Sequence, residues 1–172
     1  MSCWHDYMTV DGTQSKHMGL RIPAQRASAD PVRVARLLNH SLRFHKRSGD
    51  RSGKCDAFFT GEPEDVVWGV VFDIDPAEKP RLDEHEGLGH GYADKLITVI
   101  GLDGDVHPVF TYTAEASHID PTLRPYSWYK RFVVEGARQH TLPPDYIARI
   151  EATPATEDPD RIRDAAKRRV AC

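Results

Sequence analysis

Residues 66–74 read Val-Val-Trp-Gly-Val-Val-Phe-Asp-Ile, an apolar run without the alternation of a half-exposed strand. Apolar side chains at successive positions bury both faces of a strand, which is typical of the middle of a covered sheet. The run therefore predicts a central strand, around which the rest of the chain is arranged. Shorter apolar runs at 41–44 and 55–60 predict two further strands before it.

A short acidic helix is expected after this strand. It leads into residues 80–92, Pro-Arg-Leu-Asp-Glu-His-Glu-Gly-Leu-Gly-His-Gly-Tyr. Asp75 can cap its N-terminus, and Pro76 suits the first helical position. Gly87 can adopt the left-handed conformation that closes many helices. The helix is thus expected to begin just after Asp75 and to end at Gly87.

Glu86 would be the last side chain of this helix. A carboxylate there lies near the negative end of the helix dipole, and Asp83 on the same face adds a like charge. Both effects raise the pKa of a carboxyl group. A carboxyl group that takes up and releases a proton suits general acid/base catalysis, and the alternative is an ordinary solvent-exposed acidic helix.

A β-hairpin is predicted downstream of the helix. Residues 95–100 and 106–113 flank Asp103-Gly104, a dipeptide typical of tight turns between antiparallel strands. Upstream, residues 45–54 are basic and contain glycine, so they are expected to form an exposed loop.

Two helices are expected towards the C-terminus. Ser127 is placed to cap an amphipathic helix over 128–137, and a short helix is expected over 145–150. The composition then becomes polar and charged. We therefore expect one domain over residues 1–152 and a charged C-terminal tail over 153–172, either a loosely docked helix or partly disordered.

Composition restricts the class of protein. A chain of 172 residues with 40% hydrophobic and 28% charged residues suits a single domain with a sizeable core. The net charge of −3 gives no electrostatic reason to expect nucleic acid or an anionic membrane as a partner. No signal peptide or membrane-spanning run is expected. The 3 scattered cysteines suit reduced thiols, and hence a cytoplasmic location.

No metal site is expected. His85-Glu86-Gly-Leu-Gly-His90 resembles the helix of zinc proteases, but it has one residue too many, and its glycines would break the helix. The other histidines lack the spacing of metal ligands. Cys55 could act as a nucleophile, but its place in an expected strand favours a small buried thiol.

Several short motifs occur together in a characteristic order. They are Val67-Trp68-Gly69-Val70-Val71, Leu82-Asp83-Glu84-His85-Glu86-Gly87, Tyr92, Tyr126-Ser127-Trp128-Tyr129-Lys130, Gly136-Ala137 and Leu142-Pro143-Pro144-Asp145-Tyr146. This ordered set resembles the gamma-glutamylcyclotransferase family, in its bacterial branch, over roughly residues 7–150. The resemblance implies a mixed α/β (α+β) fold, a small mixed β-barrel with flanking helices and a pocket at one end.

The resemblance also implies a reaction. The family releases 5-oxoproline from a gamma-glutamyl amine or amide, and the substrate's own α-amine attacks its γ-carbonyl. The family's catalytic glutamate corresponds to Glu86, and no metal or organic cofactor takes part. Tyr92 and Tyr129 match tyrosines that line the family's pocket, although each could equally be a core aromatic. The expected partner is a small gamma-glutamyl substrate, with no nucleic acid and no membrane, for a monomer or homodimer.

One departure from the family keeps other functions open. The family's first strand ends in Tyr-Gly-Ser-Asn, whose backbone amides hold substrate oxygens. The nearest equivalent here is Asp11, Gly12, Thr13 and Gln14 after a strand at 7–10. The main alternative is therefore a catalytically inactive small-molecule-binding protein of the same fold. A third hypothesis is an RNA-associated protein that uses the basic residues 45–54 and 167–169.

Overall fold

The computed structural model of this chain describes residues 7–10 and 31–169. The strands are β1 (Tyr7–Val10), β2 (Pro31–Leu38), β3 (His40–Arg47), β4 (Gly53–Phe59), β5 (Val66–Phe72), β6 (Tyr92–Gly101) and β7 (Val106–Ala114). The α-helices are α1 (Lys79–Glu86), α2 (Ser127–Gln139), α3 (Pro144–Ala152) and α4 (Arg161–Arg168), with short 3₁₀ helices at Pro76–Glu78 and Ala116–His118.

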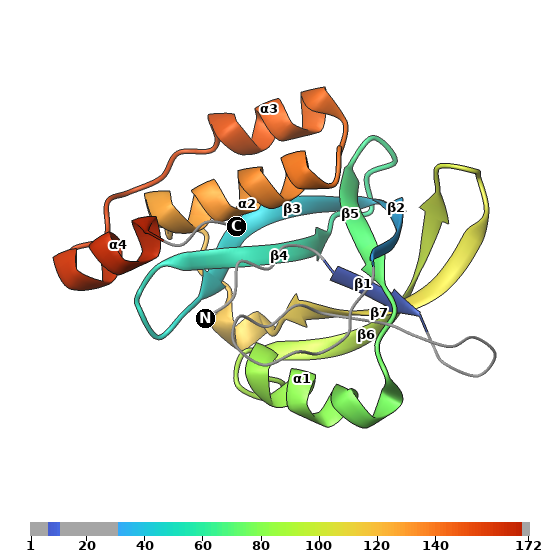
Figure 1. Ribbon diagram of the computed structural model, residues 1–172, viewed down its shortest axis with the longest axis horizontal. Helices are drawn as coiled ribbons and strands as arrows, with labels where there is room; N and C mark the ends of the chain where they lie inside the picture. Colours follow the sequence, from blue (N-terminus) through green and yellow to red (C-terminus); the bar gives the residue numbers. More distant parts are fainter. Residues whose placement is uncertain (1–6, 11–30, 170–172) are drawn as a thin grey trace.

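The sheet closes into a small barrel in the strand order β1-β5-β2-β6-β7, while β3 and β4 pair as a separate ribbon. β1 runs parallel to β5 and antiparallel to β7, so the barrel is mixed. Helices α2 and α3 lie side by side over one side of the molecule, and α1 lies on the opposite side of the barrel (Figure 1). This arrangement confirms the mixed α+β barrel with flanking helices.

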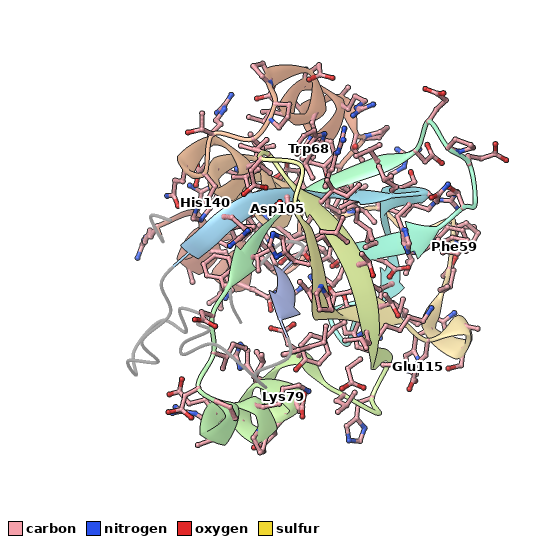
Figure 2. The ribbon with its side chains drawn as sticks, turned by 90° about the vertical axis from the view of Figure 1, so that its right-hand side faces the viewer. Phe59, Trp68, Lys79, Asp105, Glu115 and His140 are labelled. Atoms are coloured by element: carbon pink, nitrogen blue, oxygen red, sulfur yellow. The ribbon has the colours of Figure 1, made fainter. Side chains whose placement is uncertain are left out.

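Strand β5 separates two apolar clusters, as its sequence predicts. Val67 and Val71 point into the barrel, whose core also contains Ala35, Leu37, Ala57, Val99 and Val109. Val70 and Phe72 belong to the second cluster, with the buried face of α2. Trp68 packs against this second cluster and lies on the helical side in Figure 2. Both faces of β5 are therefore covered, which is why no alternation is visible in its sequence.

The exposed loop expected over residues 45–54 is confined to residues 48–52. His45 and Lys46 complete β3, Lys54 belongs to β4, and the connection between them is short. The pairing shifts register between Phe44 and Lys46, and three consecutive side chains from Phe44 to Lys46 are buried. This irregularity, a β-bulge, breaks the period-2 pattern by which a strand is recognised. Lys46 is thus buried and Lys54 partly buried, whereas Arg47 and Arg51 stay exposed.

The predicted hairpin and C-terminal helices are confirmed. Gly104 adopts φ 88° in the turn between β6 and β7. Helices α2 and α3 form where expected, and Trp128, Phe132 and Val133 are buried on one face of α2. Ser127 does not cap α2, however. The capping position falls on Tyr126, and the Ser127 hydroxyl accepts a hydrogen bond from Arg168 of α4.

The C-terminal segment docks through one buried carboxylate. Asp158 accepts a hydrogen bond from the Trp128 indole at 2.8 Å and two from the Arg163 guanidinium at 2.6 Å. These bonds tie the segment that leads into α4 to the first turn of α2. The division between a domain at 1–152 and a tail at 153–172 stays a prediction. Over the described part of the chain, the helices are too short or too polar to cross a membrane.

Candidate active site

Glu86 is the last residue of α1, and the local sequence sets both ends of the short helical segment. Asp75 accepts a hydrogen bond from the Ala77 amide at 2.9 Å, with Pro76 in the first turn. Gly87 is left-handed at φ 78°, and its amide donates to the Asp83 carbonyl at 3.0 Å. The predicted start and end of this segment are therefore confirmed.

A glycine-rich turn brings Tyr92 back beside the end of this helix. Gly87, Gly89 and Gly91 have φ values of 78°, 74° and 114°, which side chains with a Cβ adopt only at a cost. The Gly89 amide donates to the Tyr92 carbonyl at 2.9 Å and closes the turn. A Cβ on Gly91 would lie 2.9 Å from Cε of Lys46, so glycine also allows this lysine to approach. The turn thus sets Tyr92 and Lys46 near α1.

The carboxyl group of Glu86 is buried, although the residue as a whole is partly exposed. Burial raises its pKa to about 7, and the nearby charge of Lys46 acts in the opposite direction. Its Oε1 atom is inaccessible and has no hydrogen-bond partner among the described residues. The raised pKa was predicted from the helix end and from Asp83, but its main cause is burial. The Asp83 carboxylate itself accepts hydrogen bonds from Lys79 and Tyr112.

Tyr92 and Tyr129 both bond to the backbone of one residue of β4, Cys55. The Tyr92 hydroxyl donates to the Cys55 carbonyl at 2.7 Å, and the Cys55 amide donates to the Tyr129 hydroxyl at 3.2 Å. Burial raises the pKa of Tyr129 well above its usual range, so its hydroxyl is a neutral group. Cys55 is itself buried, as the strand reading predicts. The two tyrosines therefore connect α2 and β6 through the ribbon that carries Lys46.

Sequence reasoning missed Lys46 and Tyr112. Lys46 is 8% exposed, and its ammonium lies 4.4 Å from the centroid of the Tyr92 ring. The pKa of Tyr112 is raised by burial and by its hydrogen bond to Asp83, with a smaller contribution from Glu86. The hairpin register could have identified Tyr112, because it pairs with Asp94, two residues from Tyr92. Nothing in the local sequence marks Lys46, because its burial depends on the bulge.

The expected substrate-binding loop Asp11, Gly12, Thr13 and Gln14 lies outside the described residues. The strand expected before it is present as β1. Because β1 pairs in parallel with β5, both strands end at the same edge of the barrel, the edge from which β5 leads to α1. The role of this loop stays a prediction.

The described residues hold one group with the spacing of metal ligands, Asp103, Asp105 and His107 at the β6–β7 turn. Figure 2 places Asp105 at the end of the hairpin opposite to Glu115. The Asp103 carboxylate accepts the Asp105 amide, and His107 contacts Arg33. This exposed turn is therefore stabilised by its own contacts and lies away from the end of β7 that leads to Glu115.

Comparison with known proteins agrees with this fold. The model of the AIG2-like family matches residues 66–150, which include α1 and Glu86. The mouse (Mus musculus) gamma-glutamylcyclotransferase is 30% identical over 148 residues, covering 84% of this chain and 77% of that protein. The chain belongs to the gamma-glutamylcyclotransferase family. The human (Homo sapiens) gamma-glutamylcyclotransferase is 29% identical over 140 residues, covering 77% of this chain and 71% of that protein.

A solved structure supports the same family. A gamma-glutamyl cyclotransferase superposes with a TM-score of 0.70 at 26% identity, covering 82% of this chain and 86% of that chain. The resemblance to the gamma-glutamylcyclotransferase family is thus confirmed in sequence and in fold. Its bacterial branch stays a prediction.

Proposed function

We propose that this protein is a gamma-glutamylcyclotransferase-like enzyme that releases 5-oxoproline from a gamma-glutamyl amine or amide, with Glu86 as general acid and base. The observation that most directly supports this proposal is the buried Glu86 carboxyl group, which has a pKa of about 7 and no partner for Oε1 in the described chain. A carboxyl group with this pKa exchanges a proton readily at neutral pH. A solvated acid with the ordinary pKa of about 4.3 would be a much weaker base.

The reaction needs one group that takes a proton and returns it. Ionised Glu86 accepts a proton from the substrate's α-ammonium group, and the free amine attacks the γ-carbonyl carbon. A new carbon–nitrogen bond closes the five-membered ring. Glu86 then gives the proton to the leaving nitrogen as the old carbon–nitrogen bond breaks, and the ring nitrogen, which still carries two hydrogens, releases one of them to the departing amine. Because the attack is intramolecular, the main task of the site is to hold the substrate in its folded conformation.

The remaining assignments are part of the same proposal. Tyr92 and Tyr129 would form one wall of the substrate site, held in place by their bonds to Cys55. The amides of Gly12 and its neighbours would hold substrate oxygens. We place the reaction in the cytoplasm, as the reduced cysteines suggest.

The direct test is to incubate the protein with a panel of gamma-glutamyl amino acids and amines and to assay 5-oxoproline. We expect turnover by the wild type and a loss of at least about 100-fold in Glu86→Gln, the usual scale for a removed acid/base group. Circular dichroism should show the same fold in both. His85→Gln, at the neighbouring exposed position of α1, is the matched control and should retain activity.

Two results would contradict the proposal. Equal turnover by Glu86→Gln would remove Glu86 from the reaction. Binding of the panel without release of 5-oxoproline would instead favour the inactive binding protein of the same fold.

A further inference from the structure

Lys46 is a buried cation without a counterion among the residues that the structure describes. It is 8% exposed, and its ammonium lies 4.4 Å from the centroid of the Tyr92 ring. No ion pair or hydrogen bond joins it to an acidic group of the described chain. Burying a lysine in this way is unfavourable unless something compensates its charge. Within the described chain, Lys46 therefore has no carboxylate in direct contact, although Glu86, Glu115 and Asp50 act on its charge at longer range.

Lys54, the neighbouring lysine, has a carboxylate partner. Lys54 pairs with Lys46 across the β3–β4 ribbon. Its ammonium donates to the Asp50 carboxylate and to the Ser52 hydroxyl, each at 2.7 Å. Of these two lysines in facing positions, Lys54 has a carboxylate partner, whereas Lys46 has none among the residues that the structure describes.

The position of Lys46 is fixed by its surroundings. Its Cε lies close to where a Cβ of Gly91 would be, and its ammonium lies over the Tyr92 ring. The charged groups that act on it are Lys54, Glu86, Glu115 and Asp50, and burial has the largest effect, lowering the pKa of Lys46. The charges of Lys46 and Glu86 therefore act on each other, although no ion pair joins the two side chains within the described residues.

We propose that Lys46 binds a carboxylate of the substrate. The inference rests on the proposed function. A carboxylate would supply the missing counterion, and Lys46 over the Tyr92 ring would orient it beside Glu86. Two carboxylates are candidates, the α-carboxylate of the glutamyl group and the carboxylate of an amino-acid leaving group. In both cases the carboxylate carbon lies two bonds from the nitrogen that would exchange a proton with Glu86.

The test compares Lys46→Met and Lys46→Arg on two substrates, gamma-glutamyl-alanine and gamma-glutamyl-ethylamide. Losing a hydrogen bond to a charged group should raise KM by about 10- to 100-fold in Lys46→Met. Lys46→Arg should retain most of the affinity. An equal rise on both substrates assigns the α-carboxylate, and a rise on gamma-glutamyl-alanine alone assigns the leaving-group carboxylate. An unchanged KM on both overturns the inference, whatever happens to kcat.

Controls separate this role from folding. Lys95→Met removes a lysine from an exposed position of β6 and should leave KM unchanged. Removing an unpaired buried charge should keep or raise the Tm of Lys46→Met, whereas a purely structural lysine would lower it. A fall in Tm with an unchanged KM counts against the inference.

A binding measurement keeps the inference testable if the wild type does not turn over. Calorimetric titration of the wild type and of Lys46→Met with gamma-glutamyl-alanine should then still show weaker binding by the variant. Absence of turnover with this difference defeats the proposed function alone. Equal binding, or no binding by either protein, overturns the role of Lys46.

Discussion

The carboxyl groups of Asp158 and Glu86 are both buried, but the groups around them differ. Asp158, before α4, accepts bonds from the Trp128 indole, from Arg163 and from the Asp160 amide. The Arg163 guanidinium, helped by the other donors, holds the pKa of Asp158 at about 2. Glu86, at the end of α1, has no donor for its buried Oε1 within the described chain, and burial raises its pKa to about 7.

The contrast shows that burial alone does not determine what a carboxylate does. Donors directed at the oxygens stabilise the charged form, and Asp158 becomes a permanent anion that fixes a segment to α2. Without donors, burial disfavours the charge, and Glu86 can hold or release a proton at neutral pH. The first arrangement is structural and the second suits catalysis.

The largest expected effect is the pH dependence of turnover. Glu86 must be ionised to accept the first proton, so kcat/KM should rise with pH and level off above about 7, the pKa of Glu86. At pH 5 the ionised fraction is about 1%, which predicts a rate about 100-fold below that at pH 8. Initial rates of 5-oxoproline release between pH 5 and 9 measure this. A profile that is flat down to pH 5 would mean that Glu86 remains ionised at pH 5, as Asp158 does.

Next in size is the loss of stability in Asp158→Asn. The asparagine amide cannot form the ion pair with Arg163, and the donors around position 158 lose their charged acceptor. We therefore expect the free energy of unfolding to fall by about 2 kcal/mol. Because the pKa of Asp158 is lowered, its contribution is fully present above about pH 4 and is lost as pH falls towards 2. Urea unfolding at pH 7 and at pH 3 should show a smaller difference between variant and wild type at pH 3. Turnover of folded Asp158→Asn should be unchanged.

Glu86→Gln should change stability in the opposite direction. The folded-state pKa of Glu86 lies above its usual value of 4.5, so the native protein binds more protons between pH 4.5 and about 7. The free energy of unfolding of the wild type therefore falls as pH rises through this range. The neutral glutamine avoids this loss, and we expect the variant to be about 1–2 kcal/mol more stable at pH 8, and equal at pH 4. A variant less stable than the wild type at pH 8 would mean that the ionised carboxylate is stabilised in the fold.

The smallest effect is expected for Tyr112→Phe. This change removes the hydroxyl that donates to Asp83 and leaves the ring in place. Lys79 still pairs with Asp83, so the loss should be about 1 kcal/mol. Thermal unfolding measures it. If the acid limb of the pH–rate profile also moves, Tyr112 contributes to the environment of Glu86 as well as to the position of α1.

Some of this molecule follows directly from short segments of sequence. The helix that ends on Glu86 depends on Asp75, Pro76 and Gly87, each of which acts on its immediate neighbours. The β6–β7 hairpin depends on Asp103-Gly104 in the same way. By contrast, the loop expected over 45–54 covers only residues 48–52 in the structure, because the bulge before Lys46 exists only through pairing with β4. The cause of the raised pKa of Glu86 was misjudged for a similar reason, since desolvation comes from residues distant in sequence.

The sequence by itself determined where the chain turns, which strand has two apolar faces, and which acidic residue stands at the end of α1. These properties depend on backbone preferences and on the local spacing of apolar groups. Only the tertiary structure decided that Glu86 is desolvated, that Tyr92 and Tyr129 meet at Cys55, and that Lys46 is a buried cation. Burial and charge depend on every group nearby in space, and the groups nearby in space come from five separate parts of the chain, the elements β3, β4, α1, β6 and α2.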